Sequence, residues 1–239
     1  MSAPWPIEGS VAVVTGVGPG TGAALATRFA AGGYRVAMLA RSEERLAALA
    51  ETLSGAVAFP CDIADEAALA ACLAEIRDRL GAPRVIVHNA VGGAFGDFME
   101  TNASILRRNF EVNVTALLHL AQATAPAMIE QGGGAIVATG NTAAYRGKPA
   151  FAGFAPTKAA QRILLESIAR SAGPKGVHAA YVAIDAVIDT PRARRMAPDQ
   201  PDAFFAKPAD IAEEVWRIAH QPRSTWSFDS VIRPFGEAW

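Results

Sequence analysis

Short apolar runs rich in β-branched residues alternate along the chain with segments whose apolar residues recur at helical spacing. Leu46, Leu49 and Leu53, for example, follow Ser42, a residue type that commonly caps helix N-termini. Strands that alternate with helices need crossover connections, so the pattern predicts a three-layer, doubly wound α/β fold with a mostly parallel, seven-stranded sheet. The predicted strands run from Val11 to Thr15, Arg35 to Leu39, Ala56 to Phe59, Arg84 to His88, Ala135 to Thr139, Val177 to Ile184 and Ser227 to Ile232.

The 239 residues suit a single domain, residues 1–239, because the chain is too short for two full enzyme domains. Apolar residues make up 51% of it, but charges or glycines interrupt each apolar run before the roughly 20 residues that a membrane helix needs. The formal net charge is −1 without blocks of like charge, which argues against nucleic acid or a membrane surface as partner. Residues 1–10 lack the features of a signal peptide, so we expect a cytoplasmic protein.

Cysteine and histidine give no sign of a disulfide or of a metal centre. Cys61 and Cys72 form no Cys-x-x-Cys motif, and a chain with this much apolar material needs no covalent cross-link. The four histidines lack the spacing of metal ligands. We therefore expect reduced thiols and no bound metal.

Residues 191–207 interrupt the regular alternation and are rich in Pro, Arg and Phe. Such an excursion often covers a pocket, so this segment is predicted to be a substrate lid. Arg192, Arg194 and Arg195 within it would attract an anionic substrate, or else form the solvated face of a short helix.

A glycine-rich run, Thr15-Gly16-Val17-Gly18-Pro19-Gly20-Thr21-Gly22, directly follows the first predicted strand. Glycine lacks the Cβ that would prevent a tight turn and a close approach of the backbone to a pyrophosphate. The helix that follows would aim its free N–H groups and positive dipole end at the phosphates. An ordinary glycine turn has the same local sequence, but in this position the run predicts a dinucleotide site formed by Gly16, Gly18, Gly20, Thr21 and Gly22.

The second predicted strand ends Ala40-Arg41-Ser42, about 20 residues past the glycine run, where NAD-binding proteins carry an acid for the ribose 2′-hydroxyl. No acid stands here. The guanidinium of Arg41 suits a 2′-phosphate by charge and bidentate geometry, although a solvated arginine at a strand end is the plainer interpretation. We therefore predict NADP(H) in preference to NAD(H), bound partly by Arg41 and Ser42.

Further motifs follow in order: Cys61-Asp62 after the third strand, Asn89-Ala90 after the fourth, Asn113 in Glu-Val-Asn-Val, and Lys158 opening a long helix. With the glycine run, they make the whole chain resemble the short-chain dehydrogenase/reductase family, which has a Rossmann-type fold. The resemblance implies that Asn113 supports Lys158 through a water molecule. It also implies cofactor contacts from Asp62 and Ile63 at the adenine, Asn89 and Ala90 at the riboses, Lys158 at the nicotinamide ribose, and Ile188 and Thr190 at the carboxamide.

The catalytic positions of the family are not matched. Its members carry Tyr-x-x-x-Lys where this chain reads Phe154-Ala155-Pro156-Thr157-Lys158, and a phenylalanine ring has no exchangeable proton. The family's catalytic serine corresponds to Asn141, which can still donate a hydrogen bond to a carbonyl oxygen. Divergent enoyl reductases place the tyrosine seven residues before the lysine, and that position is Phe151. By resemblance, the chain is an atypical member that lacks both the tyrosine and the serine.

Other side chains remain as proton donors near the expected pocket. Tyr145 ranks first, because its phenol has suitable chemistry and its loop borders the substrate site in relatives, although a loop tyrosine more often packs at an edge or interface. Lys158 is a further candidate, since apolar neighbours would push its amine toward the neutral form. The remaining candidates are Lys148, Asp185 and His88.

Two functions of different classes fit these residues. The first is an NADP(H)-dependent oxidoreductase that reduces a carbonyl or an activated C=C bond of a small organic molecule, its proton coming from a non-family donor or from water. The second is a catalytically inactive, NADPH-binding sensor protein. A lyase or isomerase with a tightly held cofactor is a third idea without a specific signal. In relatives the tail that here ends in Trp239 lies at a subunit contact, so we expect a homodimer or homotetramer.

Overall fold

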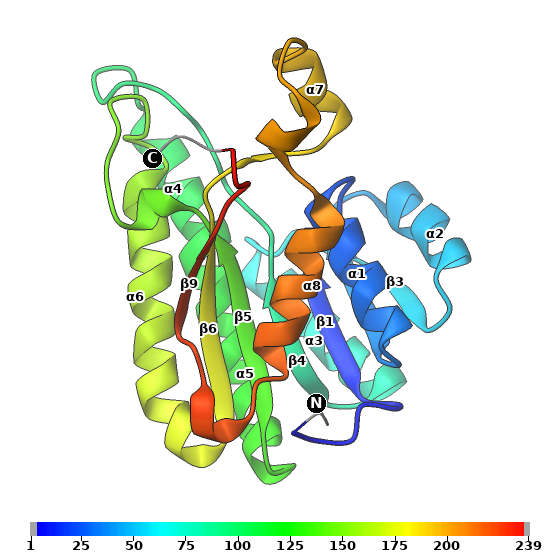
Figure 1. The fold of residues 1–239 in the computed structure, drawn as a ribbon. Helices are drawn as coiled ribbons and strands as arrows, with labels where there is room; N and C mark the ends of the chain where they lie inside the picture. The colour runs from blue at the N-terminus through cyan, green and yellow to red at the C-terminus, as the bar shows by residue number, and fades with distance from the viewer. Residues whose placement is uncertain (1–3, 237–239) are drawn as a thin grey trace.

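The computed structural model describes residues 4–236 and has one central sheet of seven parallel strands (Figure 1). The strand order β3-β2-β1-β4-β5-β6-β9 reverses beside β1, which is the doubly wound arrangement predicted from the sequence. The last strand begins at Asp229, two residues later than predicted. The strands of the sheet are β1 (Val11–Thr15), β2 (Arg35–Ala40), β3 (Ala56–Pro60), β4 (Pro83–His88), β5 (Gly134–Gly140), β6 (Val177–Ile184) and β9 (Asp229–Ile232).

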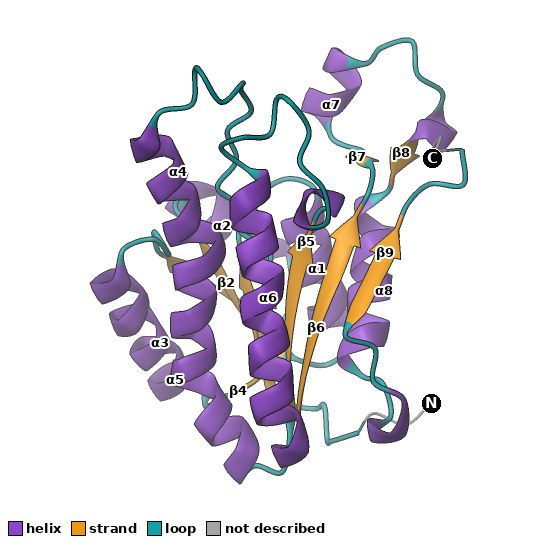
Figure 2. Cartoon of the chain, turned by 90° about the vertical axis from the view of Figure 1, so that its left-hand side faces the viewer, coloured by secondary structure: helices purple, strands orange, loops and turns teal. Residues whose placement is uncertain are grey.

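Helices cover both faces of this sheet (Figure 2). Along β1, Val11 and Val13 enter one apolar core, and Ala12 and Val14 enter the other, because successive side chains of a strand point to opposite faces. The first core lies under α3, α5 and α6, and the second lies under α1, α2 and α8. The helices are α1 (Thr21–Ala31), α2 (Glu43–Thr52), α3 (Glu66–Leu80), α4 (Ala103–Phe110), α5 (Ala116–Glu130), α6 (Ala155–Ala172), α7 (Pro191–Met196) and α8 (Pro208–Ala219).

A π-helical turn, Glu111–Thr115, joins α4 to α5 in one helical stretch of 28 residues, Ala103–Glu130. Within residues 4–236, this is the one stretch long and apolar enough to cross a membrane by length and composition alone. The sequence pattern did not show it, because the turn joins two shorter patterns. Leu117, Leu120 and Met128 on α5 are fully buried in the core against the sheet, so this stretch is a covering helix of the fold.

The predicted lid segment leaves the sheet after β6 and stands above it, with α7 at its top (Figure 1). Its two stems pair as a small parallel sheet of β7 (Val187–Ile188) and β8 (Phe205–Ala206). Arg194 on α7 binds both Asp189 at 2.7 Å and Asp202 at 2.6 Å, which ties the excursion together. Arg192 and Arg195 are exposed. Trp239, expected at a subunit contact, lies outside the described residues.

Three histidines packed inside the fold predict a loss of stability in acid. Burial is the main cause that lowers the pKa of His88, to about 3, and also lowers the pKa values of His178 and His220. The unfolded chain takes up protons below its ordinary histidine pKa of about 6.5 while the folded protein does not, so stability falls as the pH falls.

We expect the free energy of unfolding to drop by at least about 2 kcal/mol between pH 7 and pH 5, which is the share of His88 alone. Chemical denaturation at the two pH values measures this difference. An unfolding free energy that stays constant over this interval would contradict the burial of neutral imidazoles.

Candidate active site

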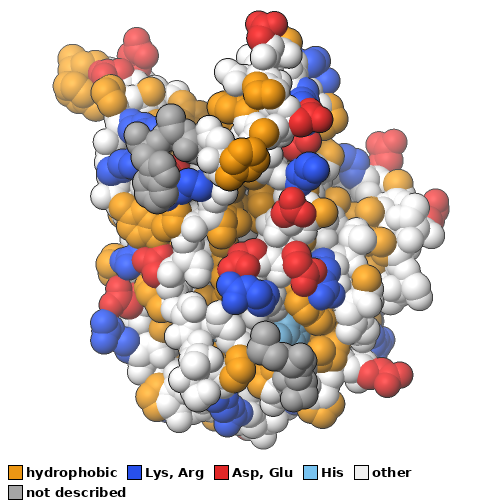
Figure 3. Space-filling model, viewed as in Figure 1, with side chains coloured by type: hydrophobic (Ala, Val, Ile, Leu, Met, Phe, Trp, Pro, Cys, Tyr) orange, Lys and Arg blue, Asp and Glu red, His pale blue; other side chains and the backbone are white. Residues whose placement is uncertain are grey.

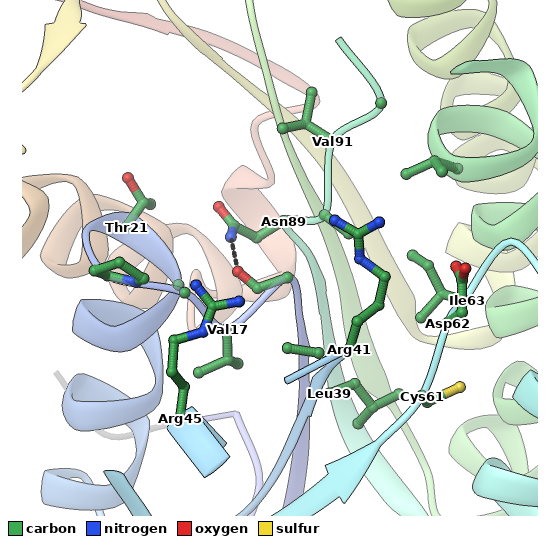
Figure 4. Close-up of a pocket in the computed structure, with 18 of the residues that line it drawn as sticks. Val17, Thr21, Leu39, Arg41, Arg45, Cys61, Asp62, Ile63, Asn89 and Val91 are labelled. Carbon is green, nitrogen blue, oxygen red and sulfur yellow. Dashed lines mark hydrogen bonds between the residues drawn. The ribbon is translucent and has the colours of Figure 1, made fainter. Parts of the chain in front are cut away.

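A cavity of about 560 Å³ opens at the carboxyl ends of the central strands, where doubly wound sheets bind their ligands (Figure 4). The glycine turn after β1 forms one wall, the ends of β2 and β3 form another, and the segment after β4 closes the back. All of the predicted cofactor residues line it except Gly20, Ser42 and Lys158. Those that do are Gly16, Gly18, Thr21, Gly22, Arg41, Asp62, Ile63, Asn89, Ala90, Ile188 and Thr190.

The glycine turn is packed so closely that side chains do not fit at two of its positions. Gly16 has φ 69°, and a Cβ there would lie 2.5 Å from the Cα atom of Ala90. A Cβ on Gly22 would overlap the carbonyl oxygen of Gly16. Gly18 differs, since a Cβ there would meet nothing within 4 Å and would extend into open space at the cavity.

The N-terminus of α1 faces the cavity with unused hydrogen-bonding capacity. Its capping residue is Gly20, which has no side chain to bond the first N–H groups of the helix. Thr21 Oγ1 is buried yet has no hydrogen-bond partner among residues 4–236. A phosphate group would bind to such N–H groups and hydroxyls, so this end of the cavity fits the pyrophosphate of a dinucleotide.

Two guanidinium groups, from Arg41 and Arg45, line the cavity beside the glycine turn (Figure 4). Arg41 follows β2 as the sequence predicted, and Arg45 lies one helical turn later on α2. Ser42 was expected to bind the cofactor, but its hydroxyl accepts the Arg45 N–H at 3.4 Å and caps α2, and Ser42 does not line the cavity. The sequence analysis did not single out Arg45, because it lies on the first turn of α2 and not at the end of the strand.

Asp62 and Asn89 line the cavity, but both are engaged within the protein. Asp62 accepts hydrogen bonds from Ala64 N at 3.2 Å and from Arg108 at 2.6 Å. Partial burial raises the pKa of Asp62, but these hydrogen bonds outweigh it, so the net pKa is below the ordinary value. Asn89 Nδ2 donates to Gly16 O at 3.0 Å (Figure 4). Its Oδ1 accepts from Thr139 Oγ1 at 3.0 Å. Arg108, which holds Asp62, escaped the sequence analysis.

The stem of the lid segment passes over the glycine turn. Ile188 and Thr190 line the cavity, as the resemblance implied for the carboxamide end of a cofactor. Thr190 Oγ1 accepts the Ala193 N–H at 3.1 Å and caps α7, and its Cγ2 lies 3.0 Å from where a Cβ on Gly20 would be. The lid segment and the glycine turn are therefore in direct contact.

Lys158 does not line the cavity and lies in a buried cluster of hydrogen-bonded polar side chains. Its Nζ donates to Gln161 Oε1 at 2.9 Å, and Gln161 Nε2 donates to the carbonyl oxygen of Asn113 at 2.8 Å. The Asn113 side chain bonds Gly92 and donates to Thr157 Oγ1 at 2.8 Å. Gln161, a residue that the sequence analysis did not single out, thus links Lys158 to Asn113 by direct hydrogen bonds.

Burial dominates the electrostatics of Lys158. The side chain is 2% exposed, and desolvation lowers the pKa of its amine to about 7. Its Nζ lies 5.8 Å from the centre of the Phe154 ring. Phe154 in turn packs against Phe151 and Phe95, with ring centres 6.0 and 5.4 Å away. The amine is therefore enclosed between one amide and an aromatic cluster.

The other proton-donor candidates are engaged elsewhere. The Tyr145 hydroxyl donates to Asp229 on β9, with Arg162 over its ring, so the turn after β5 directs it to the α6–β9 side instead of the cavity. Burial and Asp229 raise the pKa of Tyr145. Asn141 Oδ1 accepts from Ala143 N at 2.8 Å and its Nδ2 donates to Ile184 O at 3.0 Å.

The three remaining candidates have neighbours of their own. Asp185 accepts the Thr142 hydroxyl at 2.5 Å and lies 3.8 Å from Arg146. Lys148 lies over the Phe151 ring. His88 is fully buried, and its Nδ1 is 3.2 Å from Thr15 Oγ1.

Comparison with known proteins agrees with this geometry. A family model described as short chain dehydrogenase matches residues 10–201. The 7alpha-hydroxysteroid dehydrogenase of Escherichia coli (strain K12) is 29% identical over 242 residues, covering 96% of this chain and 94% of the relative.

Two solved structures share the whole fold. An alcohol dehydrogenase from the archaeon Thermococcus sibiricus, complexed with 5-hydroxy-NADP, matches with a TM-score of 0.86 and 25% identity, covering 96% of this chain and 98% of the other. A 7 alpha-hydroxysteroid dehydrogenase complexed with NADH and 7-oxo glycochenodeoxycholic acid matches with a TM-score of 0.85 and 26% identity, covering 96% and 95%. The chain belongs to the short-chain dehydrogenase family, whose model matches residues 10–201.

Proposed function

We propose that the protein is an NADP(H)-dependent reductase of a small organic carbonyl or activated C=C compound, with a non-standard active site. The single observation that carries this proposal is the cavity itself, with an uncapped helix N-terminus at one side and two guanidinium groups beside it. The two solved dehydrogenase structures that share this fold hold 5-hydroxy-NADP and NADH, which supports a nicotinamide cofactor here.

The preference for NADP(H) rests on charge at the end of β2. Arg41 and Arg45 both line the cavity there, and a 2′-phosphate adds negative charge that two guanidinium groups would bind. Asp62, the nearest acid in the cavity lining, already accepts the Arg108 guanidinium and so is not free to repel a phosphate strongly.

Arg41→Ala should weaken NADPH binding at least tenfold and the double variant with Arg45→Ala about a hundredfold, since each change removes a charge-assisted hydrogen bond worth roughly 1.5–3 kcal/mol. NADH affinity should stay within about threefold, because NADH lacks the 2′-phosphate. Fluorescence titration with both cofactors measures this, and Arg170→Ala on the exposed side of α6 is the control. Equal losses for NADPH and NADH would refute the assignment.

For the chemistry, the cofactor would supply the hydride, and this chain would supply position and a proton. Phe154 and Asn141 occupy the places of the family's tyrosine and serine by resemblance, and neither offers an acidic proton. Lys158 is the titratable group that lies beside Phe154, and its pKa of about 7 means that both ammonium and amine exist near neutral pH. We assign it the proton-holding role, at Nζ, ahead of Tyr145.

An apolar substrate suits the entrance. Figure 3 shows hydrophobic side chains gathered over the loop that precedes α4, with a notch between this loop and α7. The side chains of Phe95, Phe98 and Met99 in this loop are at least 67% exposed, and that of Met196 on α7 is 74% exposed. Residues 191–207 would act as the lid over such a substrate, in a protein that we expect to work as a homodimer or homotetramer in the cytoplasm.

The competing function is an NADPH-binding sensor without turnover. It is favoured by the aromatic cluster, because Phe95, Phe151 and Phe154 fill the space beside Lys158 with groups that transfer no proton. Purified protein mixed with NADPH and a panel of ketones, aldehydes and enones distinguishes the two through the absorbance of NADPH. Consumption with any substrate supports the reductase, whereas tight NADPH binding with no consumption across the panel supports the sensor.

A further inference from the structure

Lys158 and Gln161 form a buried pair that no charged residue of the described chain neutralises. Gln161 is fully buried, one turn after Lys158 on α6. Among residues 4–236, its Oε1 is the hydrogen-bond partner of Lys158 Nζ, at 2.9 Å. An amine held this deeply by one neutral amide has its position set almost entirely by that amide.

The other end of the Gln161 amide is held equally firmly. Its Nε2 donates to the carbonyl oxygen of Asn113 at 2.8 Å, across 48 residues of chain. Asn113 lies in the π-helical turn, where the altered helical register leaves a carbonyl oxygen available to a side chain. The amide therefore has both of its polar atoms used, and it connects α6 to the turn between α4 and α5.

We propose that Gln161 is a positioning residue, which holds Lys158 Nζ in place by bridging it to the carbonyl oxygen of Asn113, whose side chain bonds the cavity-lining Gly92. The catalytic use of Lys158 rests on the proposed reductase function. The two hydrogen bonds of the bridge form in the chain without cofactor. A glutamine that merely fills the core would tolerate an isosteric change without effect on Lys158.

The groups that face Lys158 are few. Among residues 4–236, His88 on β4 is the ionisable side chain whose pKa the charge of Lys158 lowers, and that pKa, about 3, places its titration far below neutral. Phe154 contributes an aromatic ring, and Thr157 next to Lys158 is bonded to Asn113. A change at position 161 should therefore act on Lys158 directly.

The test uses the full chain labelled with ¹³C at the lysine Cε atoms, which is favourable because the sequence has four lysines: Lys148, Lys158, Lys175 and Lys207. The resonance that Lys158→Met removes is that of Lys158, and its pH titration is followed by NMR without cofactor. Gln161→Glu keeps the side-chain shape and places a carboxylate beside Nζ, so the midpoint should rise by at least one pH unit. Gln161→Met should instead lower it or leave the amine neutral throughout.

Gln122→Glu, at an exposed glutamine on α5, is the matched control and should leave the Lys158 titration unchanged. The same shift in Gln161→Glu and Gln122→Glu, or no shift in either while thermal stability falls, would overturn the proposal. NADPH titration of the same variants tests the function separately, since Gln161→Met should bind NADPH at least tenfold more weakly. If the NMR midpoint moves and no form of the protein binds NADPH, the positioning role stands and the reductase proposal fails.

Discussion

Gly22→Ala should abolish measurable NADPH binding, with a loss of at least a hundredfold in affinity. A Cβ at this position would overlap the Gly16 carbonyl oxygen and lie 2.8 Å from the Cα atom of Val17. Both neighbours are backbone atoms of the glycine turn, so they cannot move aside as a flexible side chain does. The turn must open, and the N-terminus of α1 must leave the place where it faces the cavity.

Two further glycine variants separate the causes of this loss. Gly18→Ala meets nothing within 4 Å, so it should keep the unfolding free energy of the parent yet bind NADPH more weakly, because its methyl group occupies space at the cavity. A Cβ on Gly173 would also meet nothing within 4 Å, and this residue lies far from the glycine turn in sequence. Gly173→Ala should therefore change neither the unfolding free energy nor the affinity for NADPH. Denaturation curves and fluorescence titrations of the three variants measure both quantities, and normal NADPH affinity in Gly22→Ala would refute the dinucleotide site.

Phe154→Tyr should raise kcat for the reduction of a carbonyl substrate by at least about a hundredfold, the lower range of what a placed general acid contributes. The ring already packs 5.8 Å from Lys158 Nζ, and a nearby ammonium lowers the pKa of a phenol. NADPH affinity should stay within about threefold, since the ring remains in the aromatic cluster. Steady-state kinetics measures this with the substrate that the parent turns over fastest, or with the whole panel.

Phe151→Tyr is the matched control. The Phe151 ring belongs to the same aromatic cluster, but the lysine over it is Lys148, whereas Lys158 lies over the Phe154 ring. It should leave kcat within about threefold. If both variants bind NADPH and neither gains turnover, the pocket is not shaped for carbonyl reduction, and the sensor becomes the better account. A gain in both would show that any nearby phenol suffices.

The strands could be predicted well because their information is local. A strand buried on both faces is a continuous apolar run, and each of the seven runs became a strand of the sheet. The small sheet of β7 and β8 could not be predicted in this way, since two-residue strands have no periodicity and form only because Val187 and Phe205 are brought together by the fold. The π-helical turn likewise lies inside an apparently regular pattern.

In the candidate site, too, the residues with a local sequence signal could be predicted and those with distant partners could not. The glycine run, Arg41 and Asp62 carry their signal in sequence order, and the structure brings them to one cavity. The direction of a side chain is not local information: Tyr145 finds its acceptor in Asp229, 84 residues later. Gln161 finds its acceptor in Asn113, 48 residues earlier. No spacing within a single segment reports such pairs.

The π-helical turn has a geometric consequence for both ends of its helix. One extra residue in a helical turn rotates everything beyond it by about 100° relative to an uninterrupted helix. α5 can therefore keep its apolar stripe on the sheet while α4 presents a different side, from which Asn109 donates to the Gly153 carbonyl just before α6. A single helical stretch thus contacts two differently oriented parts of the fold, the sheet and the segment that precedes α6, without a loop between them.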